Sequence, residues 1–105
     1  PLEVQALCAP GGMGLLRMLL GDRLEVGRAI HDGRVEVVIR GHNEYALAGE
    51  LAGLVEWLEV TAPTGVRNQL TWIGHELVSR YGGAADVAEW EADAARARRS
   101  QGPKP

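Results

Sequence analysis

Apolar and polar residues alternate along the start of the chain, a period of two that is typical of a half-buried β-strand. One face of residues 2–9 carries Leu2, Val4, Ala6 and Cys8. The alternation returns around residues 24–30 and 35–39, and the dipeptide Asp32-Gly33 between them is typical of a type I′ hairpin turn. The pattern therefore predicts one strand near the N-terminus and a β-hairpin after it.

Two further stretches carry apolar residues at helical spacing. Four leucines recur in this way within residues 13–20, and Gly21 follows them as a C-terminal cap. Asn43 is the predicted N-cap of a second helix. The apolar stripe of that helix consists of Leu47, Leu51, Leu54 and Val55.

A short strand and a long helix complete the main pattern. Residues 57–60 form the predicted strand, Pro63 ends it, and Thr64 follows as the N-cap of a helix that extends to residue 81. The stripe of this helix consists of Val66, Leu70, Ile73, Leu77 and Tyr81. Trp72 falls on the opposite side of the helix, among polar residues.

These elements follow the order β-α-β-β-α-β-α. We expect an α+β fold, a ferredoxin-like β-α-β-β-α-β sandwich with an additional C-terminal helix, because each split β-α-β unit crosses over right-handed and both helices then cover one sheet face. Residues 1–83 would form this domain. Residues 84–105 are predicted to form a marginal helix, rich in alanine and charge, that continues into a flexible tail.

The uncovered face of the predicted sheet carries one glutamate from every strand. They are Glu3, Glu25, Glu36 and Glu59. Sheets of this topology that bind RNA need aromatic platforms with basic neighbours on their central strands, and this sequence does not provide them. We therefore expect no binding of single-stranded nucleic acid on this face.

The stripe of the last helix is not expected to pack on the glutamate-bearing face, since burying carboxylates is costly. It needs the sheet edge or a second copy of the chain. Trp72 and Trp57 lie off the predicted core, and tryptophan commonly anchors interfaces. We predict a homodimer with interface residues Trp72, Trp57, Val66, Leu70, Ile73 and Leu77. The alternative is that Trp90 of the C-terminal segment covers Trp72 within one chain.

Composition adds limits to this picture. The chain has 105 residues, of which 46% are hydrophobic and 24% charged, as in ordinary folded domains. No apolar run approaches the roughly 20 residues that cross a bilayer, so no membrane partner is expected. Cys8 is the only cysteine, which excludes an internal disulfide and suits a cytoplasmic location. The formal net charge of -3 gives no general attraction to DNA.

Candidate catalytic residues are few. His31, His42 and His75 have neither a second ligand at metal spacing nor a partner that would activate a nucleophile. We expect surface histidines, no enzymatic activity, and no metal or cofactor. The chain does not begin with methionine, so we also expect a fragment of a longer protein.

The glycine-containing residues 10–14 follow a strand and open a helix, which is the context of a phosphate-binding loop. The spacing departs from G-x-G-x-x-G because Arg17 stands in the place of the third glycine. A simple strand-to-helix turn is the preferred interpretation. The alternative is an ACT-like regulatory domain that senses a small ligand at a dimer interface, with Arg17, Gly12 and Gly14 as ligand-binding residues.

The last predicted helix has an uneven charge distribution. Its basic cluster consists of Arg96, Arg98 and Arg99. Three acidic residues precede this cluster: Glu89, Glu91 and Asp93. Because these acids can neutralise much of the cluster, we expect a solvated segment. The alternative is a weak contact with DNA phosphates.

A family resemblance is centred on residues 47–81 and extends back through the hairpin to Val4. It is carried by Leu-Ala-Gly-Glu-Leu-Ala-Gly-Leu at residues 47–54, Glu-Trp-Leu-Glu-Val-Thr-Ala-Pro at residues 56–63 and the closing Val-Ser-Arg-Tyr. This helix, strand, proline and helix with a terminal aromatic resemble the C-terminal extension, often called WCX, of WYL-domain transcriptional regulators. Two positions depart from the family pattern: Val55-Glu56 replace a glycine before the strand, and Ala62 replaces an acidic residue before the proline.

The resemblance implies a C-terminal dimerisation or regulatory module of a bacterial transcription factor. In this family, a winged helix-turn-helix domain contacts DNA and a WYL domain senses a ligand. The module would therefore meet DNA only through missing N-terminal domains, and a small-molecule effector is a further candidate partner.

Overall fold

The computed structural model describes residues 1–100, apart from the side chains of residues 84–87 and 100. The chain forms two compact units, Pro1–Ile73 and Gly74–Pro105. One long helix extends from the first unit into the second. The tail predicted beyond residue 100 lies outside the described residues.

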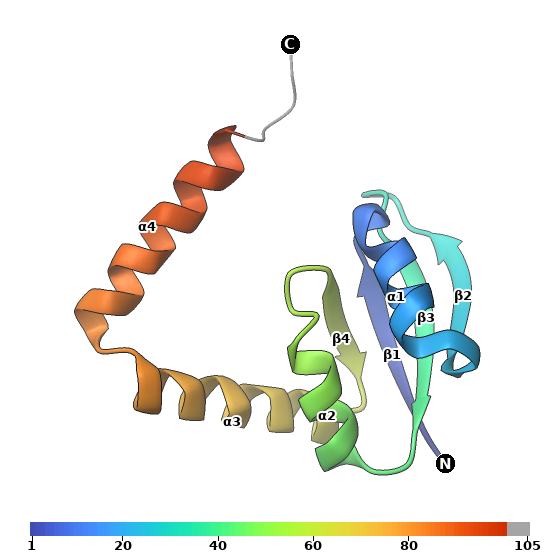
Figure 1. Cartoon of the computed structure of the whole chain (residues 1–105). Helices are drawn as coiled ribbons and strands as arrows, with labels where there is room; N and C mark the ends of the chain where they lie inside the picture. Colours follow the sequence, from blue (N-terminus) through green and yellow to red (C-terminus); the bar gives the residue numbers. More distant parts are fainter. Residues whose placement is uncertain (101–105) are drawn as a thin grey trace. The chain divides into compact units, whose positions relative to one another are not determined.

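The first unit is a small α+β domain (Figure 1). Its elements are β1 (Leu2–Cys8), α1 (Met13–Leu20), β2 (Leu24–Ala29), β3 (Val35–Gly41), α2 (Glu44–Ala52), β4 (Leu58–Ala62) and the first part of α3 (Thr64–Tyr81). Short 3-10 turns, Pro10–Gly12 and Gly21–Arg23, precede and follow α1. The four strands form one antiparallel sheet in the order β2-β3-β1-β4.

One face of this sheet is buried beneath α1 and α2, which lie on the same side (Figure 1). The inward face predicted for β1 is confirmed, since Val4, Ala6 and Cys8 are buried. The rest of the core consists of Leu16, Leu20, Val37, Ile39, Leu47, Ala48, Leu51, Leu54, Leu58, Val60 and Val66. Burying one such large aliphatic side chain contributes about 1.5–3 kcal/mol, so this face is the main source of the domain's stability.

Burial also raises the pKa of the Cys8 thiol, which donates to the carbonyl of Ala9.

The β2–β3 hairpin is confirmed, but the predicted turn type is wrong. The N–H of Gly33 donates to the carbonyl of Ile30 at 2.9 Å, and the N–H of Ile30 donates to the carbonyl of Arg34 at 2.8 Å. A type I′ turn needs positive φ at both central residues, whereas here Gly33 has a φ of 91° and Asp32 does not have positive φ. Residues 31–33 therefore form a three-residue loop with glycine at the left-handed position.

The start of α2 agrees with the sequence, and its end does not. Asn43 Oδ1 accepts a hydrogen bond from the N–H of Ala46 at 2.7 Å, as predicted for the N-cap. The helix ends at Ala52, however, so Val55 lies in the following turn rather than on the helical stripe. Its side chain is 79% exposed. The placement of Val55 in the core is therefore wrong.

Trp57 is half-buried against the turn between β1 and α1. Its carbonyl accepts a hydrogen bond from the N–H of Ala9 at 2.8 Å. A Cβ added at Gly12 would lie 2.6 Å from Trp57 Cβ and 2.9 Å from its Cγ. Only glycine fits this contact without a shift of the backbone, so the tryptophan holds the turn against the sheet.

A bidentate ion pair joins the segment after α1 to α2. The two terminal nitrogens of Arg23 donate to the two carboxylate oxygens of Glu50, at 2.9 and 2.6 Å. These hydrogen bonds lower the pKa of Glu50 and raise the pKa of Arg23. The pair thus connects the two helices that cover the sheet.

Gly12→Ala should destabilise the domain, because the added Cβ overlaps atoms of Trp57 close to its backbone. We expect a loss of about 1–3 kcal/mol in the free energy of unfolding, measured by urea denaturation. Gly14→Ala is the matched control, since its added Cβ meets nothing within 4 Å on the exposed side of α1. It should gain up to about 1 kcal/mol from helix propensity. Equal stability of the two variants would contradict the Trp57–Gly12 contact.

Glu50→Gln should reduce the acid sensitivity of the domain. Because the pKa of folded Glu50 is lowered, the pair contributes fully above the unfolded pKa of about 4.3 and loses its contribution as pH falls through the folded pKa. Solvent screening of these half-exposed side chains limits the effect to less than about 1 kcal/mol.

Thermal unfolding would measure this difference. The melting temperatures of wild type and Glu50→Gln should differ at neutral pH and converge toward about pH 3. Glu56→Gln, in the exposed turn before β4, is the control that should follow wild type. A difference that stays constant with pH would argue against the role of the Glu50 charge.

Candidate functional site

The open face of the sheet carries the four predicted glutamates, and each has an arginine partner. Arg40 on β3 contacts Glu25 on β2 at 2.6 Å and Glu3 on β1 at 3.7 Å. Arg28 contacts Glu36 at 3.5 Å. Positive and negative side chains are therefore paired on this face, and neither sign of charge dominates it.

A second arginine spans the central strand from the other end. Arg34, just before β3, contacts Glu59 on β4 at 2.8 Å, although β1 lies between these two strands. It also pairs with Asp32 at 2.9 Å. The N–H of Arg34 donates to the Asp32 carboxylate and lowers its pKa, and both carboxylates raise the pKa of Arg34. Arg34 and Arg40 together link all four strands on this face.

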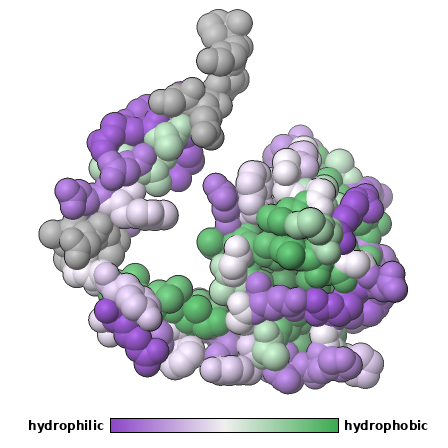
Figure 2. Space-filling model, in the orientation of Figure 1, coloured by the Kyte–Doolittle hydropathy of each residue, from purple (hydrophilic) through white to green (hydrophobic). Residues whose placement is uncertain are grey.

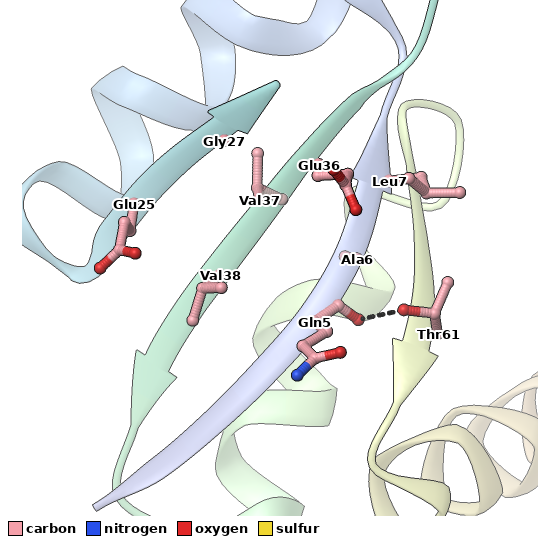
Figure 3. Close-up of a pocket in the computed structure, with 9 residues that line it drawn as sticks. All are labelled: Gln5, Ala6, Leu7, Glu25, Gly27, Glu36, Val37, Val38 and Thr61. Atoms are coloured by element: carbon pink, nitrogen blue, oxygen red, sulfur yellow. Dashed lines mark hydrogen bonds between the residues drawn. The ribbon is translucent and has the colours of Figure 1, made fainter. Parts of the chain in front are cut away.

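A shallow hollow of about 340 Å³ lies on the same face (Figure 3). Its lining mixes acidic and apolar groups, including Glu25, Glu36, Leu7 and Val38. Thr61 Oγ1 donates to the carbonyl of Gln5 at 3.1 Å and closes one side. The hollow offers neither a basic surface for phosphates nor the stacked aromatic residues that bind single strands.

The second unit presents a different kind of surface. It contains the last part of α3 and the helix α4 (Ala84–Ser100). A hollow of about 710 Å³ between these two helices is lined by Gly74, Leu77, Val78, Tyr81, Gly82, Trp90 and Glu91. The lining is largely apolar, and Figure 2 shows apolar surface along α3.

The large side chains around this hollow, which we call the α3–α4 hollow, are unusually exposed. The exposed fraction is 52% for Leu77, 50% for Val78, 79% for Tyr81 and 68% for Trp90. Single exposed apolar residues are common, but a contiguous group on one helical pair is typical of an interaction surface. The α3–α4 hollow is therefore the candidate functional site.

The apolar stripe predicted on α3 is buried at the start of the helix and exposed at its end. Val66 is fully buried, and Leu70 and Ile73 are partly buried and pack against the core. Arg67 fixes this end of the helix by donating to the carbonyl of Val60 on β4. Val66 is therefore enclosed in the core of the first unit and is unavailable to a partner, which corrects its place among the predicted interface residues. As expected, the stripe does not pack on the glutamate-bearing face.

The other predicted interface residues fall in two places. Trp72 is 50% exposed on α3, and Leu77 lines the α3–α4 hollow. Trp57 is half-buried and faces the turn before α1, so its main contact is internal. Participation of Trp72 and Leu77 in an interface stays a prediction.

Sequence reasoning did not single out Val78 and treated Trp90 only as a cover for Trp72. Val78 lies next to Leu77 and just beside the predicted stripe, so strict helical spacing omitted it. Tyr81 belonged to the stripe but was not named as an interface residue. The available signal was Trp90, a large aromatic residue on a helix in which most other residues are alanine or charged.

The predicted ligand loop does not form an open cradle. Residues Pro10–Gly12 form a 3-10 turn in which the N–H of Gly12 donates to Ala9 and the N–H of Met13 donates to Pro10. Trp57 occupies the space beside Gly12, while Gly14 and Arg17 are exposed. The two amides that would face a phosphate are thus bonded to the chain itself.

The histidines are exposed, as expected for surface residues. Within residues 1–100, no group of three or more metal-binding side chains comes together. In the same part of the chain, no helix has both the length and the apolar character to cross a bilayer.

A second apolar patch lies on α1. Met18 and Leu19 face outward there, and Figure 2 shows an extended apolar area on the first unit. It consists of aliphatic side chains on one short helix, and it lacks the aromatic residues that characterise the α3–α4 hollow.

Comparisons with protein-family models, curated proteins and solved structures give no match to this chain.

Proposed function

We propose that this chain is the C-terminal dimerisation and regulatory module of a WYL-type bacterial transcriptional regulator. The module pairs two copies of the regulator and leaves DNA contacts to other domains. The observation that carries the proposal is the exposed apolar lining of the α3–α4 hollow.

The arrangement of the first unit supports this assignment. The strand order β2-β3-β1-β4, with α1 and α2 on one face, is the arrangement expected for a ferredoxin-like sandwich. The helix, strand, proline and helix that carry the resemblance to WCX extensions correspond to α2, β4, Pro63 and α3. This order supports our assignment of the module as a ferredoxin-like domain with a helical addition.

The energetics of α3 and α4 favour association. Covering one large apolar side chain contributes about 1.5–3 kcal/mol, and four such side chains are half or more exposed in a single copy. An alanine-rich helix of 17 residues is also only marginally stable without a packing partner. Pairing with a second copy supplies both the cover and the packing.

The surface charges support a role away from DNA. The formal net charge is -3, and the open sheet face pairs its arginines with carboxylates. Binding to DNA depends on cations that are available to neutralise phosphates. In a regulator of this type the module acts in the cytoplasm. It pairs the two subunits and does not recognise the DNA sequence.

Small-ligand sensing of the ACT type is less well supported. Its proposed residues were Arg17, Gly12 and Gly14, but Gly12 is packed under Trp57 and its N–H is already bonded. The exposed Arg17 alone does not make an anion site.

Sedimentation equilibrium tests the proposed function. We expect a monomer–dimer equilibrium with a dissociation constant at or below about 10 μM. Leu77→Lys should shift it at least about tenfold toward monomer, because it places a charge in the apolar hollow.

Val55→Lys is the matched control, since it changes an exposed aliphatic residue of the first unit and should leave association unchanged. Circular dichroism should give wild-type strand content for both variants, which shows that the first unit stays folded. A wild-type chain that stays monomeric throughout the micromolar range would refute dimerisation.

A further inference from the structure

The α3–α4 hollow has the size of a small-molecule site. Its volume of about 710 Å³ lies within the range of roughly 300–1,000 Å³ that is typical of ligand pockets. The residues that α3 contributes fall on one helical face, because positions three and four apart are neighbours on a helix. They are Gly74, Leu77, Val78 and Tyr81. A Cβ added at Gly74 would meet nothing within 4 Å, so this end of the hollow has room for a ligand.

Two large aromatic side chains belong to the lining. Tyr81 comes from α3 and Trp90 from α4, and both are well exposed to solvent. The face of an aromatic ring carries negative potential and attracts cations, most strongly when the ring is tryptophan. The hollow therefore combines apolar contact area with two groups that favour a positive charge over a negative one.

A carboxylate adds to the same preference. Glu91 follows Trp90 on α4 and is the one charged residue among the described lining residues. Two arginines of the same helices, Arg80 and Arg96, are outside the lining and are paired with Glu76 and Asp93 respectively. An anionic ligand would thus meet Glu91 without a basic residue of the lining to hold it, whereas a cation would be attracted.

We propose that the α3–α4 hollow binds an organic cation with an apolar body, such as a lipophilic quaternary ammonium or phosphonium ion. The positive charge lies beside Glu91 and the two aromatic rings, and the apolar body contacts Leu77 and Val78. The inference rests on the proposed function, since it names the chemical class of the effector that regulates the module.

The cation and a second copy of the chain compete for one surface. The side chains that hold the ligand are those that association would cover: Leu77, Val78, Tyr81 and Trp90. A ligand in the hollow therefore weakens dimerisation, and dimerisation weakens ligand binding by the same factor. This coupling gives the module a regulatory response that needs no rearrangement of the first unit.

Equilibrium dialysis of the full chain with two probe ions tests the site. Tetraphenylphosphonium and tetraphenylborate have the same shape and opposite charges, so the ratio of their affinities reports charge preference at similar apolar contact. Glu91→Gln should lower the ratio of phosphonium to borate affinity at least about fivefold, which is the effect of one charge about 4 Å away in water. Sodium buffers keep the borate in solution.

Glu89→Gln is the matched control, since it removes the same charge from α4 at an exposed position outside the lining. It should leave the affinity ratio within about twofold of wild type. Trp90→Leu keeps an apolar side chain but removes a ring, so it should weaken phosphonium binding at least about threefold. Tyr45→Leu, which changes an exposed aromatic residue of α2, should not weaken it.

Sedimentation equilibrium tests the competition. Saturating tetraphenylphosphonium should shift the wild-type equilibrium at least about tenfold toward monomer, and Glu91→Gln should need a higher phosphonium concentration for the same shift. Failure of wild type to bind the phosphonium, or equal affinity ratios in Glu91→Gln and Glu89→Gln, would overturn the cation site but leave the proposed dimer intact. Phosphonium binding without a shift toward monomer would overturn the competition. A chain that is monomeric without ligand, yet binds the phosphonium through Glu91, would refute the proposed function and keep the site.

Discussion

The rest of the structure depends on where α3 is buried. Val66 in its first turns is fully enclosed with residues of the sheet and of α1 and α2, and Leu70 and Ile73 continue this contact. The helix continues to Tyr81, beyond the reach of that core. The apolar stripe runs along the whole length of α3, but the domain core extends along only about half of the helix. The remaining apolar residues are therefore not covered by the core. That mismatch between helix length and domain size produces the α3–α4 hollow.

The glutamates on the open face of the sheet need opposite charges nearby. Four glutamates on adjacent strands would repel one another, and unpaired carboxylates are poorly suited to a partner surface. Arg34 and Arg40 reach across strands to three of these glutamates, and Arg28 pairs with the fourth, Glu36. This face is therefore satisfied by its own charges, and the association surface is left to the helices. Under the proposed function, the helices pair the copies and the charge-paired face stays outside that contact.

Much of the fold followed from the sequence because its signals are local. Alternation along β1, the cap at Asn43 and the leucine spacing of α1 each depend on neighbouring residues alone, and all were confirmed. The errors arose where a local pattern continued past the end of an element. Val55 keeps the helical spacing of α2 but follows its last residue, and the turn at Gly33 is set by the hairpin's hydrogen bonds rather than by the dipeptide.

The candidate site was predictable only in part. The stripe on α3 was visible in the sequence, but where it passes from buried to exposed depends on the width of the packed core. Leu77 was among the predicted interface residues, while Val78 and Trp90 lie beside it only once α4 follows α3. Spacing along one helix cannot report a neighbour supplied by another helix.

Amide hydrogen exchange, measured over a range of protein concentrations, tests the central claim most directly. If α4 is stabilised by a second copy, protection of residues 88–99 should rise with concentration, while the protection of β1 and β3, which belong to the core, should not change. Exchange in residues 88–99 that is equally fast at every concentration would contradict pairing through α4.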